Sequence, residues 1–338
     1  MEPAEPAPRP PRKAAARHVE TRADVDLTNL DQSLFDGATA TKRDLLEYLD
    51  GVRDRILPVL RDRPLSVIRA TRGQAPFMQK NLPKYTPDWV ARVPLWAEAS
   101  RRTVSYALCN DRRTLVWFAN QRAIEYHPTL ALADALDHPT HLVLDLDPPS
   151  ADDFSMAVSA AHLVRQALVE AGLDGAIKTS GAKGLHIFVP IDPLATMDDA
   201  AAATRAIAKR TERLDPHTAT TAFLKSDRDG KVFIDYTRTG GATVVAAYSP
   251  RARPGVPVSF PIAWDELDDL TPGDFTIFTA LERLGDGNPW ADAMPAPQTV
   301  PADLIAEGQE IPVARVAAMH EGKRRARARR AGTTESAP

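Results

Sequence analysis

The sequence predicts an α+β fold. Between residues 141 and 237, short apolar runs with the two-residue period of β-strands are interleaved with two longer segments that have helical spacing. Their order is β-α-β-β-α-β, which is the split βαβ arrangement, an antiparallel sheet with helices on one face. The chain has 338 residues, 43% of them hydrophobic, and can therefore bury one sizeable core or two smaller ones.

The segments before residue 141 are less regular. Residues 1–22 are rich in Pro, Ala and Arg, and we expect a disordered, mildly basic arm. Residues 41–60 have helical spacing of apolar residues, and Thr41 is placed to cap the N-terminus of that helix. Residues 103–127 predict strands and a short helix around a turn at 110–113.

From residue 141 onward the elements have clearer ends, and Gly172 is placed to close the first helix. In order, we expect a strand at 141–147, a helix at 152–171, strands at 176–180 and 185–191, a helix at 197–213 and a strand at 231–237. In a split βαβ sheet the last of these strands lies beside the first, and the face without helices is free to hold a site.

Composition limits the functional classes. There are 42 Lys and Arg against 45 Asp and Glu, for a net charge of -3, so a nucleic-acid surface would be a local patch. The one cysteine, Cys109, excludes an internal disulfide and a zinc site built on cysteine pairs, which fits a reducing compartment. No apolar stretch has the ~20 residues of a membrane span, and we expect a soluble cytoplasmic protein.

Two aspartates interrupt the apolar strand HLVLDLDPP at 141–149. Because side chains alternate along a strand, Asp145 and Asp147 share one face and the leucines between them face the core. Two carboxylates this close repel one another unless a cation lies between them. Taken alone, the pair also fits a solvated strand end.

A third aspartate occurs in the strand KVFIDYT at 231–237. Since this strand is expected beside the first, Asp235 would stand next to Asp145 and Asp147. Three carboxylates on one sheet face are costly without divalent cations. They suit two magnesium or manganese ions about 4 Å apart, the arrangement used for phosphoryl transfer.

The loop KTSGAKGLH at 178–186 carries groups that suit a triphosphate. Ser180 brings a hydroxyl, Lys183 an ammonium and His186 an imidazole, and the glycines bring open backbone N–H groups. The loop lacks the Walker pattern and, by itself, also fits a polar hairpin. Three arginines, Arg228, Arg251 and Arg253, flank the acidic strands and are candidate triphosphate clamps.

Four segments, LDLDPP, SGAKGLH, DRDGKVFIDY and YSPRARPG, resemble the polymerase domain of bacterial ligase D, a member of the archaeo-eukaryotic primase-polymerase superfamily. The upstream segments LTNLDQSLF, FMQKNLPKYTPDWV and TLVWFANQRAIEYH are similar to its N-terminal half, so the resemblance covers roughly residues 25–290. It implies a catalytic domain at 23–300, with an N-terminal α/β half at 23–140 and an RRM-like catalytic half at 141–290. Residues 301–338 would be a C-terminal extension whose tail has six Lys or Arg at 323–330.

The resemblance also implies roles for individual residues. The metal-binding acids would be Asp145, Asp147 and Asp235, holding two Mn²⁺ or Mg²⁺ ions. The nucleotide contacts would be Ser180, Lys183, His186 and Arg251, with Arg228 and His127 also lining the site. DNA would be bound by Asn29 and Lys42 at a 5′-phosphate and by Phe77 and Lys80 at the template. The chain departs from the family at Gln32, where a lysine is usual, at Met78, where a second phenylalanine is usual, and at Thr239, which replaces an asparagine.

The leading hypothesis is a template-directed nucleotidyltransferase that fills gaps or extends ends in broken DNA. The resemblance implies ribonucleoside triphosphates as preferred substrates, gapped or broken DNA as a partner, a location at the nucleoid, and a Ku-like protein and a separate ligase as further partners. A repair primase, a D-x-D glycosyltransferase and a non-catalytic single-stranded nucleic-acid-binding module are the alternatives. The last predicts stacking aromatic residues at the centre of the sheet, where this sequence has acids.

Overall fold

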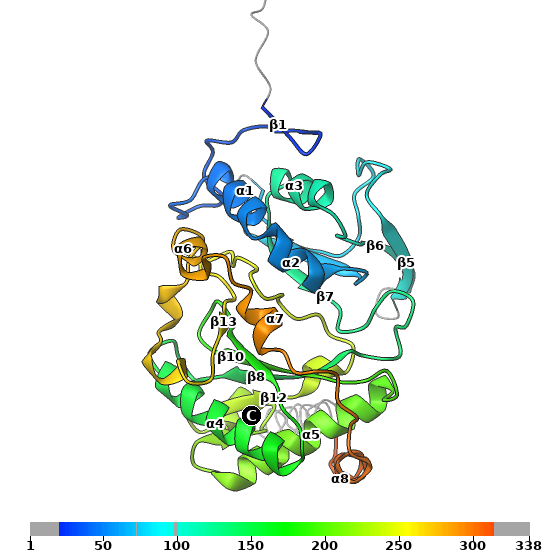
Figure 1. Cartoon of the computed structure of the whole chain (residues 1–338), viewed down its shortest axis with the longest axis vertical. Coiled ribbons are helices and arrows are strands. Elements are labelled where there is room, and N and C mark those ends of the chain that lie inside the picture. Colours follow the sequence, from blue (N-terminus) through cyan, green and yellow to red (C-terminus); the bar gives the residue numbers. More distant parts are fainter. Residues whose placement is uncertain (1–19, 72, 98–100, 314–338) are drawn as a thin grey trace, which may run out of the picture.

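The computed structural model describes residues 20–71, 73–97 and 101–313 and has the predicted α+β fold (Figure 1). Nearly all of the expected N-terminal arm and the whole basic tail lie outside these residues. Strand β1 (Thr21–Arg22) pairs with β2 (Val25–Asp26), so regular structure starts just before residue 23, where we expected the domain to begin. No helix in the described residues is long and apolar enough to cross a membrane.

The catalytic half contains a six-stranded sheet with the order β11-β12-β8-β10-β9-β13. Its central strands are β8 (His141–Asp147), β9 (Ala176–Thr179), β10 (Leu185–Pro190) and β12 (Val232–Asp235), close to the expected bounds. β12 lies antiparallel beside β8, which confirms the predicted neighbours. The edge strands β11 (Ala219–Thr220) and β13 (Pro261–Ile262) have two residues each, too few for a periodic pattern to predict them.

Helices α4 (Phe154–Glu170) and α5 (Met197–Leu214) pack against this sheet on the side away from the N-terminal half (Figure 1). α5 begins with a capping box in which Thr196 and Asp199 satisfy each other's backbone N–H groups. Helix α8 (Ala302–Glu310), from the predicted C-terminal extension, packs on α5. The helices leave the opposite sheet face open, as the pattern predicted.

The single helix expected at 41–60 is wrong, because the segment forms α1 (Lys42–Gly51) and α2 (Arg53–Leu60). The chain turns at Val52, whose φ of -94° and ψ of 5° are not helical. Gly51 precedes the break, and glycine weakens helices. Leu281 also packs so closely that a β-carbon at residue 51 would lie 2.9 Å from its methyl groups. The predicted cap is present, since the Thr41 side chain accepts from the Asp44 N–H.

The N-terminal half is built on a second, antiparallel sheet in which β3 (Leu65–Arg69) pairs with β4 (Phe77–Gln79), β6 (Arg102–Ala107) and β7 (Ala123–Pro128). β5 (Arg92–Ala97) pairs with β6, and α3 (Arg112–Asn120) precedes β7. The segment 244–249 of the catalytic half bonds to β7, for example from the Ala246 N–H to the Tyr126 carbonyl at 2.9 Å. One continuous apolar core therefore joins both halves.

The remaining elements are short and lie in the catalytic half. They are the 3₁₀ turns η1 (Lys225–Asp227), η2 (Thr237–Thr239), η3 (Leu267–Asp269) and η4 (Pro272–Asp274) and the helices α6 (Ala280–Leu284) and α7 (Pro289–Ala293). Of these, η2 matters most for the site because it follows directly on β12.

Candidate active site

A row of polar side chains crosses the catalytic sheet. Asp235 on β12 is the register partner of Asp145 on β8, which is the partner of His186 on β10, which in turn is the partner of Lys178 on β9. Asp147 lies two residues beyond Asp145 and therefore on the same face. The predicted placement of the three aspartates on one face of adjoining strands is confirmed.

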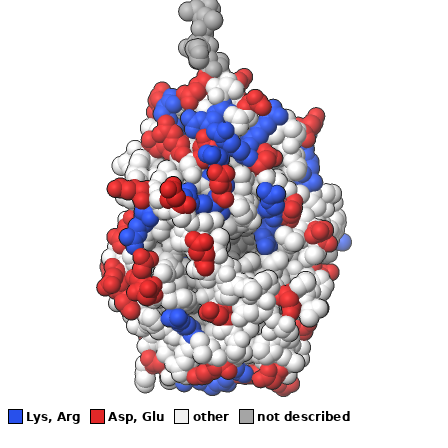
Figure 2. Space-filling model, in the orientation of Figure 1, with Lys and Arg blue, Asp and Glu red and all other residues white. Residues whose placement is uncertain are grey.

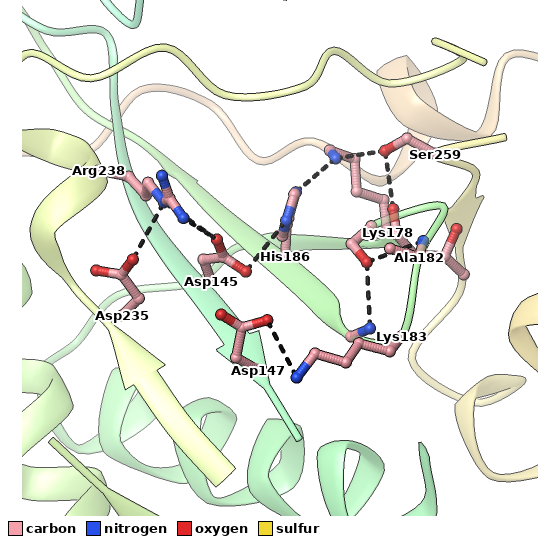
Figure 3. Close-up of polar contacts among 12 residues, drawn as sticks. Asp145, Asp147, Lys178, Ala182, Lys183, His186, Asp235, Arg238 and Ser259 are labelled. Carbon is pink, nitrogen blue, oxygen red and sulfur yellow. Dashed lines mark hydrogen bonds and ion pairs between the residues drawn. The ribbon is translucent and has the colours of Figure 1, made fainter. Parts of the chain in front are cut away.

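Both carboxylate oxygens of Asp145 face protein donors (Figure 3). Oδ1 lies 3.2 Å from Nε2 of His186, and Oδ2 lies 3.0 Å from a guanidinium nitrogen of Arg238. Burial raises the pKa of Asp145, but the bond to His186 and the charge of Arg238 outweigh burial and lower it to about 2. Asp145 is therefore ionised at neutral pH.

Asp235 is held by the turn that follows it. Thr237 donates to Oδ1 from its backbone N–H at 2.9 Å and from its hydroxyl at 2.6 Å. Arg238 lies 3.2 Å from Oδ2, so its guanidinium bridges Asp235 and Asp145 (Figure 3). Arg238 is not among the predicted site residues, and the available signal for it is its position three residues after Asp235 in the sequence.

Asp147 is the most exposed of the three acids, with 35% of its side chain accessible. The Lys183 ammonium is 3.9 Å from its Oδ1. Burial and then the charge of Asp145 raise the pKa of Asp147, against the opposing effect of Lys183. Asp147 thus carries its charge at a cost that a cation in the cleft would relieve.

Lys178 and His186 form a buried support behind Asp145. Lys178 is fully buried, with Nζ 2.8 Å from Nδ1 of His186 and 2.6 Å from the Ser259 hydroxyl. Burial, followed by the charge of Lys178, lowers the pKa of His186 to about 4. His186 is then neutral at pH 7, and a proton on Nε2, facing Asp145, satisfies both of its nitrogens.

The loop after β9 is shaped by its own hydroxyl and glycines. Ser180 Oγ accepts from the N–H groups of Ala182 at 3.2 Å and Gly184 at 3.1 Å. A β-carbon at Gly184 would lie 2.0 Å from the Leu146 carbonyl, so only glycine lets the loop approach β8 this closely. Lys183 donates to the Pro148 carbonyl and extends toward Asp147.

Glu125, on β7 of the N-terminal half, is not among the predicted site residues but holds several of them in place. Its Oε2 lies 2.8 Å from Nε2 of His127 and accepts from Nε of Arg251 at 2.9 Å. Its Oε1 accepts from the Ala252 N–H at 2.9 Å, and Arg251 also donates to the Ser180 carbonyl. Burial raises the pKa of Glu125, but His127 and Arg251 lower it to about 2. Its place two residues before His127, on the same strand face, was the signal for it.

A cleft of about 480 Å³ lies between the two halves and contains most of the predicted site. Lys80 and His127 line it from the N-terminal half, and Asp145, Asp147, Ser180, Lys183, His186 and Arg251 line it from the catalytic half. The space-filling view shows Lys and Arg densest near the top, over the N-terminal half, with acids among them (Figure 2).

Two other predicted residues lie near the cleft but point elsewhere. Arg228 stacks over the Phe233 ring at 3.8 Å and donates to the carbonyls of Ala222 and Phe223. Its charge still interacts with Asp147 and Asp235. Phe77 is exposed on β4, and strand alternation places it opposite Met78, which lines the cleft.

The predicted 5′-phosphate pocket lies at the start of α1. Asn29 is exposed and has a φ of +53°, whereas Lys42 is only 2% exposed and donates to the Thr28 carbonyl. Lys42 is therefore not a solvated first-turn lysine. Burial, followed by the charge of Arg122, lowers the pKa of Lys42 to about 8. Arg122 also donates to the Gln32 side chain at 2.6 Å.

The donor set of the three aspartates suits a hard divalent cation. Carboxylate oxygens are the ligands that Mg²⁺ and Mn²⁺ prefer. The raised pKa of Asp147 means that its negative charge is destabilised, and a bound cation would stabilise it. In residues 20–71, 73–97 and 101–313, however, no three His, Cys, Asp or Glu side chains stand together as a ready ligand set. The guanidinium of Arg238 lies between two of the three acids instead.

Comparison with known proteins gives a consistent family. Residues 41–290 match the family model described as LigD, primase-polymerase domain. The chain is 35% identical over 287 residues to the bifunctional non-homologous end joining protein LigD of Bacillus subtilis, covering 83% of this chain and 46% of that protein. It is 32% identical over 279 residues to the multifunctional non-homologous end joining protein LigD of Mycolicibacterium smegmatis, covering 80% of this chain and 36% of that protein.

A solved structure agrees with these sequence matches. The polymerase domain from Mycobacterium tuberculosis ligase D in complex with DNA superposes with a TM-score of 0.73 at 30% identity. The match covers 80% of this chain and 97% of that chain. The present chain spans less than half the length of the curated relatives named above, but nearly all of this solved domain.

Proposed function

The chain belongs to the LigD primase-polymerase domain family, whose members are nucleotidyltransferases. From this premise we propose that it is a template-directed polymerase that fills gaps or extends ends during repair of broken DNA. The observation that carries the proposal is the set of three aspartates on adjoining strands of one sheet face, two of which, Asp145 and Asp147, line a cleft together with cationic side chains. A non-catalytic binding module does not need this set, because acids on the open face repel phosphate. A D-x-D glycosyltransferase needs neither Asp235 nor the 178–186 loop.

We assign Asp145, Asp147 and Asp235 to hold two Mg²⁺ or Mn²⁺ ions, which when bound activate the primer 3′-hydroxyl and neutralise charge on the triphosphate. His186 orients Asp145 through its Nε2–H, and Lys178 fixes the imidazole from behind. Thr237 orients Asp235. The protein thus supplies carboxylates in fixed positions, and this preorganisation is its main contribution to phosphoryl transfer.

The triphosphate would lie along the 178–186 loop. Lys183 and Arg251 supply positive charge there, and the Ser180 hydroxyl can still donate its proton while its oxygen accepts from the loop. Glu125 holds Arg251 in a fixed position through its guanidinium Nε. Arg251 therefore loses little side-chain entropy when it binds phosphate.

Extension of a gapped primer-template, with each ribo- and deoxynucleoside triphosphate and with Mn²⁺ or Mg²⁺, tests this function. We expect template-dependent addition in the wild type, with ribonucleotides preferred as the family resemblance implies. Asp145→Ala or Asp147→Ala should lower the rate by at least about a hundredfold, as is typical when a group that stabilises transition-state charge is removed. Full activity in either variant would falsify the assignment, and addition without a template would point to another transferase.

Recognition of a 5′-phosphate across the gap is a finer part of the proposal. Asn29 is exposed at the turn that Lys42 anchors. The first backbone N–H groups of α1 already donate within the protein, to the carbonyls of Gln32 and Leu30 and to the Thr41 hydroxyl, so a phosphate here would be bound by side chains. Phe77 and Lys80 on the N-terminal half are assigned to the template strand. A Ku-like protein and a separate ligase remain proposed partners, with non-homologous end joining as the pathway and the nucleoid as the location.

A further inference from the structure

The guanidinium of Arg238 contacts two of the three aspartates at once. Its Nε lies 3.1 Å from Oδ2 of Asp145 and 3.2 Å from Oδ2 of Asp235, and a terminal nitrogen lies 3.0 Å from the same Asp145 oxygen. The two acids are direct register partners on neighbouring strands, where like charges destabilise a sheet. The guanidinium neutralises that repulsion.

The bridge is placed so that it can be released. Arg238 lies on the three-residue turn η2, keeps 37% of its side chain accessible and lines the cleft together with Asp145. The neighbouring Thr239 anchors the turn independently, since it is fully buried and its hydroxyl oxygen accepts from the Val143 N–H at 3.0 Å. The side chain of Arg238 can therefore swing into the cleft without loss of the turn.

We propose that Arg238 is an internal counter-cation that competes with divalent ions for the Asp145–Asp235 pair. An ion held by both acids would compete with the guanidinium, because Arg238 contacts Oδ2 of each acid while the Oδ1 atoms face His186 and Thr237. Binding of the ion and release of Arg238 are therefore one coupled step, and the protein alone has a lower ion affinity than its carboxylates would otherwise give. This inference rests on the proposed ion site and adds a control on when that site fills.

Arg238 has an anionic partner both before and after an ion binds to the Asp145–Asp235 pair. Without an ion, the guanidinium neutralises the charges of two carboxylates that are nearly buried and lie next to each other. With an ion, the released guanidinium remains in the cleft, where the triphosphate offers it a new anionic partner. Bound nucleotide should therefore favour ion binding, because it stabilises the conformation in which Arg238 has left the two acids.

Titration calorimetry with Mn²⁺ alone, on the whole chain without nucleotide or DNA, tests the competition. Arg238→Gln should bind Mn²⁺ at least about tenfold more tightly than the wild type, since a competing charge in direct contact is removed. Arg253→Gln is the matched control, because it removes the same charge from an exposed arginine that lines the same cleft. It should change the affinity by less than about threefold, an amount expected of a screened charge without direct contact.

Thermal melting gives a second, independent measurement. In a chelator, Arg238→Gln should melt below the wild type, and Mn²⁺ should raise its melting temperature more than that of the wild type. Equal Mn²⁺ affinity of Arg238→Gln and wild type, or an equal gain in Arg253→Gln, overturns the competition. If Asp145→Asn abolishes Mn²⁺ binding in that case, the proposed ion site stands; if no variant binds Mn²⁺, the ion site itself fails.

Discussion

At the scale of single residues, neighbouring aspartates on one face have opposite electrostatic situations. Asp145 is nearly buried but receives donors at both oxygens, and its pKa is lowered to about 2. Asp147, two residues along, is more exposed, yet burial and the charge of Asp145 raise its pKa. One carboxylate is stabilised by the protein, while the other is kept charged at the expense of stability.

This contrast predicts stability changes of opposite sign in a chelator at pH 7. A raised folded-state pKa means that stability falls as pH rises through that pKa, so Asp147→Asn should raise the melting temperature. A lowered folded-state pKa means that the charge stabilises the fold at neutral pH, so Asp145→Asn should cost roughly 2 kcal/mol. Calorimetric melting measures both, and shifts of the same sign in the two variants would contradict the assignment.

At the scale of elements, the sequence was most informative where a pattern repeats within one strand or helix. The alternation in 141–147 and 231–237 predicted which acids share a face, and the register confirms that placement. The helix break at Val52 was not predictable from periodicity, because it accompanies the packing of Leu281 on Gly51 from 230 residues away in the chain.

The site residues that sequence reasoning missed act through tertiary contacts. Glu125, Lys178 and Arg238 have ordinary positions in their own segments. Their importance comes from partners on other segments of the chain: Arg251 for Glu125, His186 for Lys178 and Asp145 for Arg238. The roles of all the site residues remain predictions. The fold itself brings eight of the predicted residues to one cleft: Lys80, His127, Asp145, Asp147, Ser180, Lys183, His186 and Arg251.

The first turn of α1 predicts a pH dependence of end recognition. Lys42 has its pKa lowered to about 8, so its positive charge is present at pH 7 and lost as the pH rises through 8. A 5′-phosphate has its second pKa near 6 and keeps its charge throughout this range. Preference for gapped DNA with a 5′-phosphate over the same DNA without it should fall by roughly tenfold between pH 7 and pH 9.

Fluorescence anisotropy with the two DNAs measures this preference. Lys42→Met keeps the buried aliphatic stem but removes the charge, so its preference should be weak and nearly independent of pH. If the variant shows the same decline as the wild type, another group titrates; if the wild type shows no preference at any pH, the pocket does not recognise the phosphate.

At the scale of the whole molecule, the two halves share both the core and the cleft. The segment 244–249 bonds to β7 and brings the catalytic half against His127 and Lys80. The helices α4 and α5 lie on the far side of the sheet from this cleft, and α8 adds a further layer on α5 (Figure 1). Helix α5 and the catalytic sheet therefore lie between α8 and the cleft.

The contact between α8 and α5 is unusually close. A β-carbon at Gly308 would lie 1.9 Å from the Ala202 carbonyl, and the Gly308 carbonyl accepts from Nε of Arg205 at 2.9 Å. Glu307 pairs with Arg210 and Arg213 at 2.6 Å. The start of the predicted C-terminal extension is therefore docked on the catalytic half by a backbone approach that only glycine permits.

Gly308→Ala should destabilise the protein by roughly 1–3 kcal/mol, the usual cost of overpacking a tight contact, and leave the extension rate per folded molecule unchanged at 25 °C. Gly273→Ala is the control, since a β-carbon there meets no atom within 4 Å and its melting temperature should stay near that of the wild type. Denaturant titration gives the stabilities, and primer extension gives the rate. If Gly308→Ala is as stable as the control, α8 contributes no stability, and the catalytic domain ends near residue 300 as predicted from the sequence. If the extension rate falls together with the stability, α8 supports the active site through α5. The contact for this is the hydroxyl of Thr204 on α5, which donates to Thr239, beside Arg238, at 3.1 Å.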